Sequence, residues 1–140
     1  MNATLRNRFV TDGVAAMSNE RILLALYDRL VLDLDKATAA IAARDVPSAH
    51  EQLIHAQRIV EELYLAVDTD TWPAGAELVG IYLQCRNLLV QANLHKDPRP
   101  VRACRDLVVP LAEAWHLAFE GLQQGPRVAT AAAGSFSQGA

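Results

Sequence analysis

The chain is poor in the residues that build several common kinds of protein. It has two cysteines, Cys85 and Cys104, which stand apart and form no C-x-x-C motif. We expect two buried thiols, with a disulfide or a metal-binding pair as the alternatives. Aromatic residues make up only 6% and β-branched residues are sparse, which argues against an all-β domain. The net charge of -3 argues against a nucleic-acid partner, because nucleic-acid binders carry a basic face.

Long apolar runs are also lacking. The longest, from Ile22 to Tyr27, has about six residues, whereas a membrane-spanning helix needs about 20. The polar first residues are not followed by the apolar segment of a secretory signal peptide. We therefore expect a cytoplasmic protein that does not insert into a membrane.

Alanine and leucine are abundant, with 24 and 19 copies among 140 residues, and both favour helix. Hydrophobic residues make up 51% and charged residues 21%, which is typical of a folded domain and not of a disordered chain. The apolar share is slightly high for so small a protein. Part of it therefore either thickens the core or forms a binding surface.

Apolar residues recur at alternating spacings of three and four in four segments, and each segment reads as the heptad seam of a helix. We predict helices over about 19–43, from Pro47 to about Val67, from the loop at Gly75 to about Lys96, and over 98–122. Ser18 is the expected N-cap of the first helix. The seams are Leu23, Tyr27, Leu30, Leu34, Ala37, Ile41; Ala49, Leu53, Ala56, Val60, Leu63, Val67; Leu78, Tyr82, Cys85, Leu89, Ala92; and Val101, Cys104, Val108, Leu111, Trp115, Ala118, Leu122.

Two short turns separate these segments and predict an all-α fold, an antiparallel up-down four-helix bundle. Asp45 and Asp97 are the expected caps at the turns, and Pro110 should kink the last helix. The longer loop over 68–75 leaves open whether the third helix lies beside the second or diagonally across from it. We expect one domain over 1–122, with an N-terminal arm or short helix over 1–17 and a flexible tail over 123–140.

Patterns for catalysis or metal binding are weak. Glu113 and His116 form the only Glu-x-x-His pair, whereas a di-iron bundle needs two, and both lie off the seam. His50 and His55 are five residues apart and do not share a helix face. No glycine-rich phosphate loop is present. We expect no enzymatic activity, no cofactor and no metal site.

Every helix carries apolar residues beyond its seam, and the third is apolar almost all round. Burying one leucine fully is worth about 1.5–3 kcal/mol, so several exposed leucines are costly unless a partner covers them. The surplus indicates either a thick core or a groove for an amphipathic helix of another protein. A structural or regulatory module that dimerises through the third helix is the alternative. The surplus residues are Ile22, Leu24, Leu26, Val31, Leu32, Ile54, Ile59, Leu65, Val79, Ile81, Leu83, Leu88, Val90, Leu94, Leu107, Val109, Leu117 and Phe119.

Four motifs in sequence order resemble the flagellar secretion chaperone family, FliS. They are the arm over 7–11 that leads to the Leu-rich stretch over 18–28, the Ala-Gln motif within 53–63, the Tyr…Ala-Asn motif within 81–93, and the closing segment from Asp97-Pro98 to Trp115. The arm carries Phe9 where the family often has tyrosine. Asn19 stands where proline is common.

The resemblance implies a helical chaperone that works without ATP or metal. Such a chaperone binds the C-terminal amphipathic segment of flagellin, prevents premature polymerisation and delivers it to a component of the flagellar export gate. We expect a monomer or weak homodimer when no cargo is bound.

The resemblance also implies a site on the second, third and fourth helices. Its residues are Ile54, Gln57, Ile81, Tyr82, Leu88, Leu89 and Asn93. Tyr82 and Leu89 lie on the seam as well, so a core role stays open for both, and Asn93 has a helix-capping alternative. Phe9 is expected to cover the groove when cargo is absent.

Overall fold

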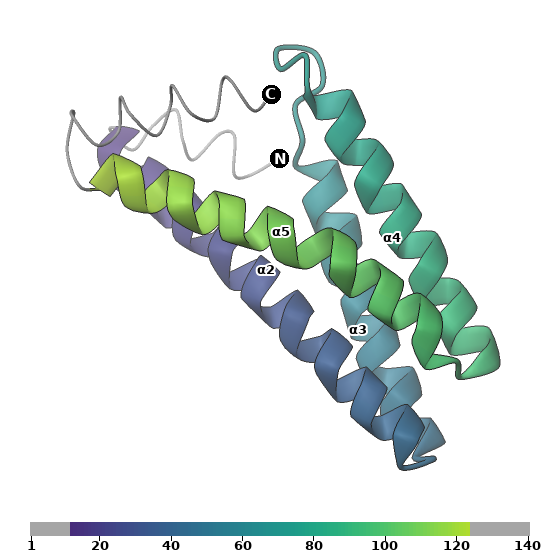
Figure 1. The fold of residues 1–140 in the computed structure, drawn as a ribbon. Coiled ribbons are helices and arrows are strands. Elements are labelled where there is room, and N and C mark those ends of the chain that lie inside the picture. Colours follow the sequence, from purple (N-terminus) through teal and green to yellow (C-terminus); the bar gives the residue numbers. More distant parts are fainter. Residues whose placement is uncertain (1–11, 124–140) are drawn as a thin grey trace.

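Four helices make up the part of the chain that the computed structural model describes, residues 12–123. They are α2 (Asp12–Ala42), α3 (Val46–Leu65), α4 (Gly75–His95) and α5 (Pro98–Gln123) (Figure 1). Each helix packs on two others: α2 and α4 each contact both α3 and α5, and within this range the backbones of diagonal pairs do not meet. The predicted all-α four-helix bundle is therefore confirmed, and the longer loop joins neighbouring helices.

The start of the first helix differs from the prediction. We expected Ser18 to cap a helix from Asn19, but α2 begins at Asp12, so that prediction is wrong. The segment over 12–18 contains Ala15, Ala16 and Met17, which are strong helix formers, and their preference outweighs the weak cost of a serine inside the helix. Part of the arm expected over 1–17 is therefore helical, and residues 1–11 lie outside the described range.

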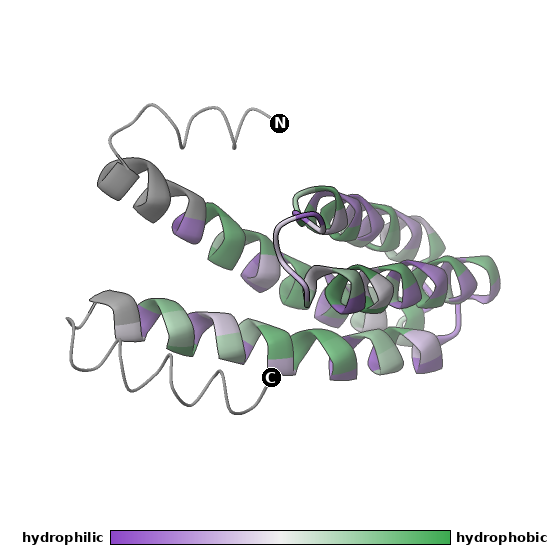
Figure 2. Ribbon diagram, turned by 90° about the horizontal axis from the view of Figure 1, so that it is seen from above, coloured by the Kyte–Doolittle hydropathy of each residue, from purple (hydrophilic) through white to green (hydrophobic). Residues whose placement is uncertain are grey.

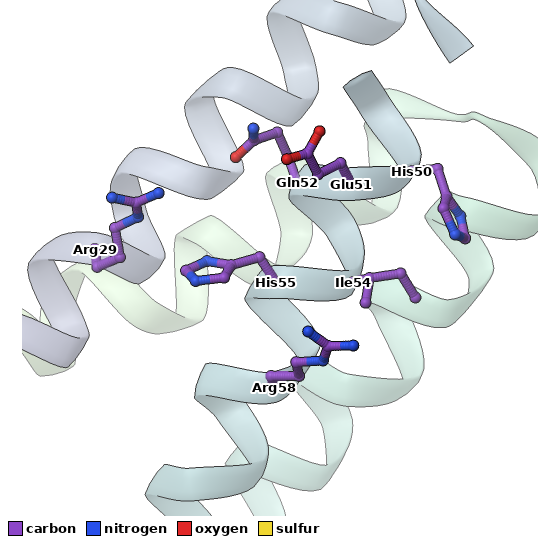
Figure 3. A pocket seen from close by; sticks show the side chains of 7 residues that line it. All are labelled: Arg29, His50, Glu51, Gln52, Ile54, His55 and Arg58. Carbon is purple, nitrogen blue, oxygen red and sulfur yellow. The ribbon is translucent and has the colours of Figure 1, made fainter. Parts of the chain in front are cut away.

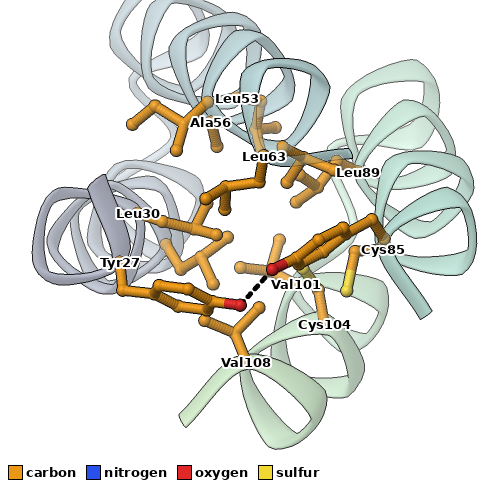
Figure 4. Packing of buried hydrophobic residues seen from close by; sticks show 14 of the residues in the cluster. Tyr27, Leu30, Leu53, Ala56, Leu63, Cys85, Leu89, Val101, Cys104 and Val108 are labelled. Carbon is orange, nitrogen blue, oxygen red and sulfur yellow. Dashed lines mark hydrogen bonds between the residues drawn. The ribbon is translucent and has the colours of Figure 1, made fainter. Parts of the chain in front are cut away.

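The predicted seams form the core. Five of their side chains, which have no exposed surface, meet along the axis of the bundle (Figure 4): Tyr27, Leu30, Leu53, Leu89 and Val101. Other seam positions are only partly buried but pack against the core, such as Leu23, Ile41, Val67, Leu111 and Trp115. The heptad pattern therefore identified the inward face of all four helices.

Both short turns use a residue in the left-handed conformation. Arg44 (φ 58°) and Lys96 (φ 47°) follow the last turns of α2 and α4. In each turn the next residue, Asp45 or Asp97, donates its N–H to a carbonyl five residues back, at 2.9 and 3.1 Å respectively. These bonds satisfy carbonyls that the helix end leaves unpaired. The same two aspartates also cap the following helices, as predicted: Asp45 accepts from the N–H of Ser48, and Asp97 from that of Arg99.

The four helices end at about the same level at one end of the bundle, which we call the flush end, and at different levels at the other, which we call the open end. At the flush end, turns of a few residues join α2 to α3 and α4 to α5. The helices differ in length, with 31 and 26 residues in α2 and α5 but only 20 and 21 in α3 and α4. Because a helix rises about 1.5 Å per residue, α2 extends about 15 Å beyond α3 at the other end. Figure 1 shows the first turns of α2 and the last turns of α5 projecting past the loop between α3 and α4, and in Figure 2 the coloured turns of both helices also continue past this loop.

The loop over 66–74 packs tightly at this end. A Cβ atom on Gly75 would lie 3.0 Å from Cγ1 of Val67 and 3.3 Å from the carbonyl oxygen of Asp68, so glycine lets α4 begin directly against the loop. Asp68 holds the turn by accepting hydrogen bonds from the N–H groups of Asp70 and Thr71 at 3.1 and 3.2 Å. The loop is therefore held in a defined conformation, and its Trp72 packs against the core.

Candidate functional site

Two of the seven predicted cargo-binding residues lie in the core. Leu89 has no exposed surface and Tyr82 only 2%. The hydroxyl groups of Tyr82 and Tyr27 share a hydrogen bond across the bundle, and Trp115 donates its Nε1–H to the Tyr27 oxygen at 3.2 Å. Side chains without accessible surface cannot contact a partner in this conformation. The core role that the seam indicated for Tyr82 and Leu89 is the one seen.

Asn93 is half-buried, and both atoms of its amide group already make hydrogen bonds within the chain. Its Oδ1 accepts a hydrogen bond from Nζ of Lys96 at 2.7 Å, and its Nδ2 donates to Nδ1 of His50 on α3 at 3.0 Å. Lys96 also reaches the backbone carbonyl of Asn93 at 2.6 Å. Asn93 therefore links α3 to α4 and ties down the end of α4, which matches the capping alternative more closely than a free recognition group.

The remaining predicted residues do not form one patch. The contact between His50 and Asn93 marks the side of α4 that faces α3, and Ile54 and Gln57 follow His50 along the same side of α3. Ile81 and Leu88 precede the core residues Tyr82 and Leu89 by one position, which places them about 100° round the helix on the side that faces α5. All four are partly buried. The structure therefore divides the predicted site between the α3–α4 and the α4–α5 boundaries.

The open end presents a third apolar area, which the sequence-based site left out. There Trp115 lies edge-on to Trp72 of the loop, with ring centres 6.4 Å apart, and stacks on Phe119 at 5.6 Å. Phe119 is half-buried, while Leu117 is 68% exposed and Ile22 of α2 is 46% exposed. Beyond the loop, α2 and α5 have no α3 or α4 to pack on.

A sequence signal for the open end existed. Ile22, Leu117 and Phe119 were all among the surplus apolar residues, and they lie at the two ends of the chain's helical part. The predicted first helix was also longer than the second. Two tight turns join two long helices to two short ones, so the long helices must project beyond the short ones at the opposite end. A comparison of the predicted helix lengths would therefore have located this area. Phe9, the predicted cover of the groove, lies outside the described residues.

The two buried tyrosines and Cys104 are held in their protonated, neutral form. Burial raises the pKa of Tyr27 and of Tyr82 above the ordinary value. The pKa of the Cys104 thiol is also raised, first by its hydrogen bond with Cys85 and then by burial. Both cysteines are free thiols. Since thiolates and not thiols are nucleophiles, this pair is a small apolar contact between α4 and α5.

The candidate metal ligands are separated in space. Within residues 12–123, no three His, Cys, Asp or Glu side chains gather where they could hold a metal ion. His116 is bonded through Nε2 to Oδ1 of Asp28 at 2.9 Å, and Glu113 is exposed. In the same range, no helix is long and apolar enough to cross a membrane.

The four helices form a closed ring with partly covered apolar side chains along α4 and at the open end, and such surfaces are typical of small helical proteins that bind other proteins. The particular family follows from comparison with known families. The model of the family described as Flagellar protein FliS matches residues 1–121, and the chain belongs to this family. FliS is a family of flagellar export chaperones, and that general role is the role of this chain. The comparison with curated proteins gave no match.

Proposed function

We propose that the chain is a cytoplasmic chaperone for flagellin. It binds the amphipathic C-terminal segment of flagellin, prevents that segment from polymerising, and delivers the cargo to a component of the flagellar export gate. The observation that carries this proposal is the set of partly covered apolar side chains on α4 and at the open end, in a chain that belongs to the FliS family.

The two apolar areas suit a long amphipathic cargo. Ile81 and Leu88 are seven residues, or two helical turns, apart on one side of α4, and apolar residues on the contact face of an amphipathic helix have the same spacing. Trp115 and Phe119, which are one helical turn apart and stack on each other, extend the apolar surface along α5 to the open end. Beyond the loop over 66–74, α2 and α5 have no other helix packed against them. A cargo helix bound at these positions would cover them as α3 and α4 do in the rest of the bundle. Each fully covered large side chain contributes about 1.5–3 kcal/mol, and these partly covered ones contribute a fraction of that.

The direct experiment is a calorimetric titration of the purified chain with the last ~50–60 residues of the host's flagellin, a length suggested by the large surfaces buried when disordered segments fold on binding. We expect a complex of one chain with one peptide and a gain in helical circular dichroism. A stable dimer that binds no peptide would instead support the dimerisation module.

A variant locates the binding surface. Ile81→Asp places a charge on the partly covered side of α4 and should abolish peptide binding while the helical circular dichroism is kept. Asn87→Asp is the matched control, because it adds the same charge to an exposed position of α4 and should leave affinity unchanged. If Ile81→Asp unfolds the chain, Ile81 belongs to the core and the α4 surface is misplaced.

A further inference from the structure

Buried ionisable groups occur at three places in the described part of the chain. Asp33 on α2 has no exposed surface, and its carboxylate pairs with Nε of Arg29 at 3.0 Å and with Nδ1 of His55 on α3. These groups lie beside an open hollow of about 360 Å³ between α2 and α3 (Figure 3). The arginines beside it are Arg29 and Arg58, and the carboxylates are Asp33 and Glu51. Two charges of each sign cancel, so the hollow has no excess charge for a ligand to neutralise.

The other two places are the tyrosine pair and the cysteine pair. The hydroxyl groups of Tyr27 and Tyr82 already bond each other, and Trp115 donates to Tyr27. Cys85 of α4 and Cys104 of α5 have no exposed surface, and both are free thiols. They are the only cysteines among the 140 residues, so neither has another partner in the chain. Unlike a carboxylate or a phenol, two thiols can be joined covalently by oxidation.

The two thiols meet across the boundary of α4 and α5. Each cysteine lies on the seam of its helix, and Figure 4 shows both among the packed side chains of the core, on neighbouring helices. Their side chains share a hydrogen bond, so the sulfur atoms are in contact. A disulfide requires the two sulfur atoms to lie about 2 Å apart, and the tight turn at 96–97 already holds α4 and α5 together on this side. The pair is therefore placed to form a bridge within one chain.

The two thiols differ in acidity. The hydrogen bond with Cys104 lowers the pKa of Cys85, although burial acts against this effect. The same bond, together with burial, raises the pKa of Cys104. Because a thiolate is the nucleophile in thiol oxidation, Cys85 is the sulfur that reacts first and Cys104 the one that completes the bridge. Both are buried, so an oxidant reaches them only when α4 and α5 separate locally, and a small oxidant is favoured.

We propose that Cys85 and Cys104 form an oxidation site, at which hydrogen peroxide joins them into a disulfide. The Cys85 thiolate attacks one peroxide oxygen and becomes a sulfenic acid; the O–O bond breaks, and the other oxygen leaves as hydroxide, which takes up the thiol proton to give water. The sulfur of Cys104 then attacks the sulfur of Cys85, the S–O bond breaks, and a second water leaves with the Cys104 proton. Two thiols lose two electrons in total, and one peroxide is reduced to two waters.

The bridge would lie on the side of α4 that carries part of the proposed cargo surface. Ile81 is four residues before Cys85 and Leu88 three residues after it, so the three share one side of the helix. Oxidation would fix α5 against that side. The oxidation site itself does not depend on the proposed function, because its chemistry uses only the two sulfur atoms of the chain and a peroxide.

The first test treats the purified full chain with hydrogen peroxide and reads its mass without reductant. We expect a product that has lost two hydrogens, is restored by dithiothreitol, and links the tryptic peptides that contain Cys85 and Cys104. The helical circular dichroism should be kept, and the urea midpoint should rise because a bridge restricts the unfolded chain. A midpoint below that of the reduced chain, bridges between chains, or no loss of hydrogen would overturn the proposal.

Two matched variants test the roles of the two sulfur atoms. Cys104→Ser keeps a hydrogen-bond donor beside Cys85 but cannot form the bridge, so the oxidation of Cys85 should stop at the sulfenic acid, which dimedone traps once the chain is unfolded in urea. Cys85→Ser leaves only the thiol that is held protonated and should give this adduct at least about tenfold more slowly. Circular dichroism checks the fold, and an alanine variant replaces either serine variant that is unfolded. Equal rates in the two variants, or an adduct in neither, would contradict the proposal.

Discussion

The helices α2 and α5 each lie in two environments along their length. In the closed part of the bundle, Leu30 and Leu34 of α2 have no exposed surface, and neither does Val101 of α5. At the open end, the seam residues Leu23 of α2 and Trp115 of α5 are only partly buried. The residue types and the spacing hardly change between the two parts. What changes is the presence of α3 and α4, which cover one part and stop before the other.

This difference teaches that the surplus of apolar residues has two explanations and not one. Where four helices meet, inward-facing surplus residues thicken the core, as Ile59 shows with 5% of its surface exposed, whereas outward-facing ones such as Leu94 stay exposed to solvent. Where only two helices continue, it remains partly covered and available to a partner. Substitutions in the closed part should therefore reduce stability, and substitutions at the open end should reduce cargo affinity.

The largest expected effect is in the closed part. Leu89→Ala should lower the free energy of unfolding by about 2–5 kcal/mol, because it removes buried methyl groups and leaves a cavity. Urea unfolding followed by circular dichroism measures this change. Leu94→Ala, at a position that is 70% exposed on the same helix, is the control and should stay within about 0.5 kcal/mol. A loss below about 1 kcal/mol for Leu89→Ala would remove the contrast between the two parts.

A smaller effect should appear at alkaline pH. Burial raises the pKa of Tyr27 and Tyr82 in the folded chain, whereas an unfolded tyrosine titrates near 10. Both phenols therefore contribute stability that is complete below pH ~10 and is lost as the pH rises towards their folded pKa values. The slope should be about 1.4 kcal/mol per pH unit for each phenol.

Tyr82→Phe should halve the part of this slope that comes from the two tyrosines. It should also cost about 1 kcal/mol at neutral pH, because it removes the hydrogen bond with Tyr27. Urea midpoints measured across the alkaline range test both expectations. Cys104, which is also held protonated, adds to the slope of both chains and cancels in the comparison. Tyr64→Phe, outside the buried core, is the control. Identical slopes for Tyr82→Phe and the original chain would contradict the assignment.

The smallest effect on stability is expected at the open end. Phe119→Ala removes a half-buried ring and should cost less than about 1 kcal/mol, but it should weaken binding of the flagellin segment about tenfold. Titration and urea unfolding of the same variant separate the two quantities. Glu120→Ala, at the next and exposed position, should change neither. A stability loss as large as that of Leu89→Ala would make the open end part of the core.

Much of the fold could be predicted from sequence because the heptad seam depends only on local spacing. The caps at Asp45 and Asp97 were predictable for the same reason, since each acts within a few residues. The start of α2 was not, because Ser18 is compatible with a cap and with a helix interior, and the helix preference of the residues before it decided the outcome.

The site was harder to predict because it depends on which neighbour each helix flank faces. Ile81 and Asn93 lie on one helix, but α5 borders one flank and α3 the other, and spacing within α4 does not contain that information. Asp33 was overlooked for a related reason. A charged residue beside a seam is usually solvated, and only the position of His55 on the neighbouring helix shows that this one is buried and paired.

The ring of helices also determines how the chain closes on itself. Three of its four contacts join helices that are consecutive in the chain, and each can form as a local hairpin. The fourth, between α2 and α5, joins residues 70 to 88 positions apart, as in the pairs Asp35–Arg105 and Tyr27–Trp115. Closing this long loop carries the largest entropic cost in the bundle. A partner that binds both helices at the open end would therefore stabilise the α2–α5 contact, which is the last to form, and would slow its opening.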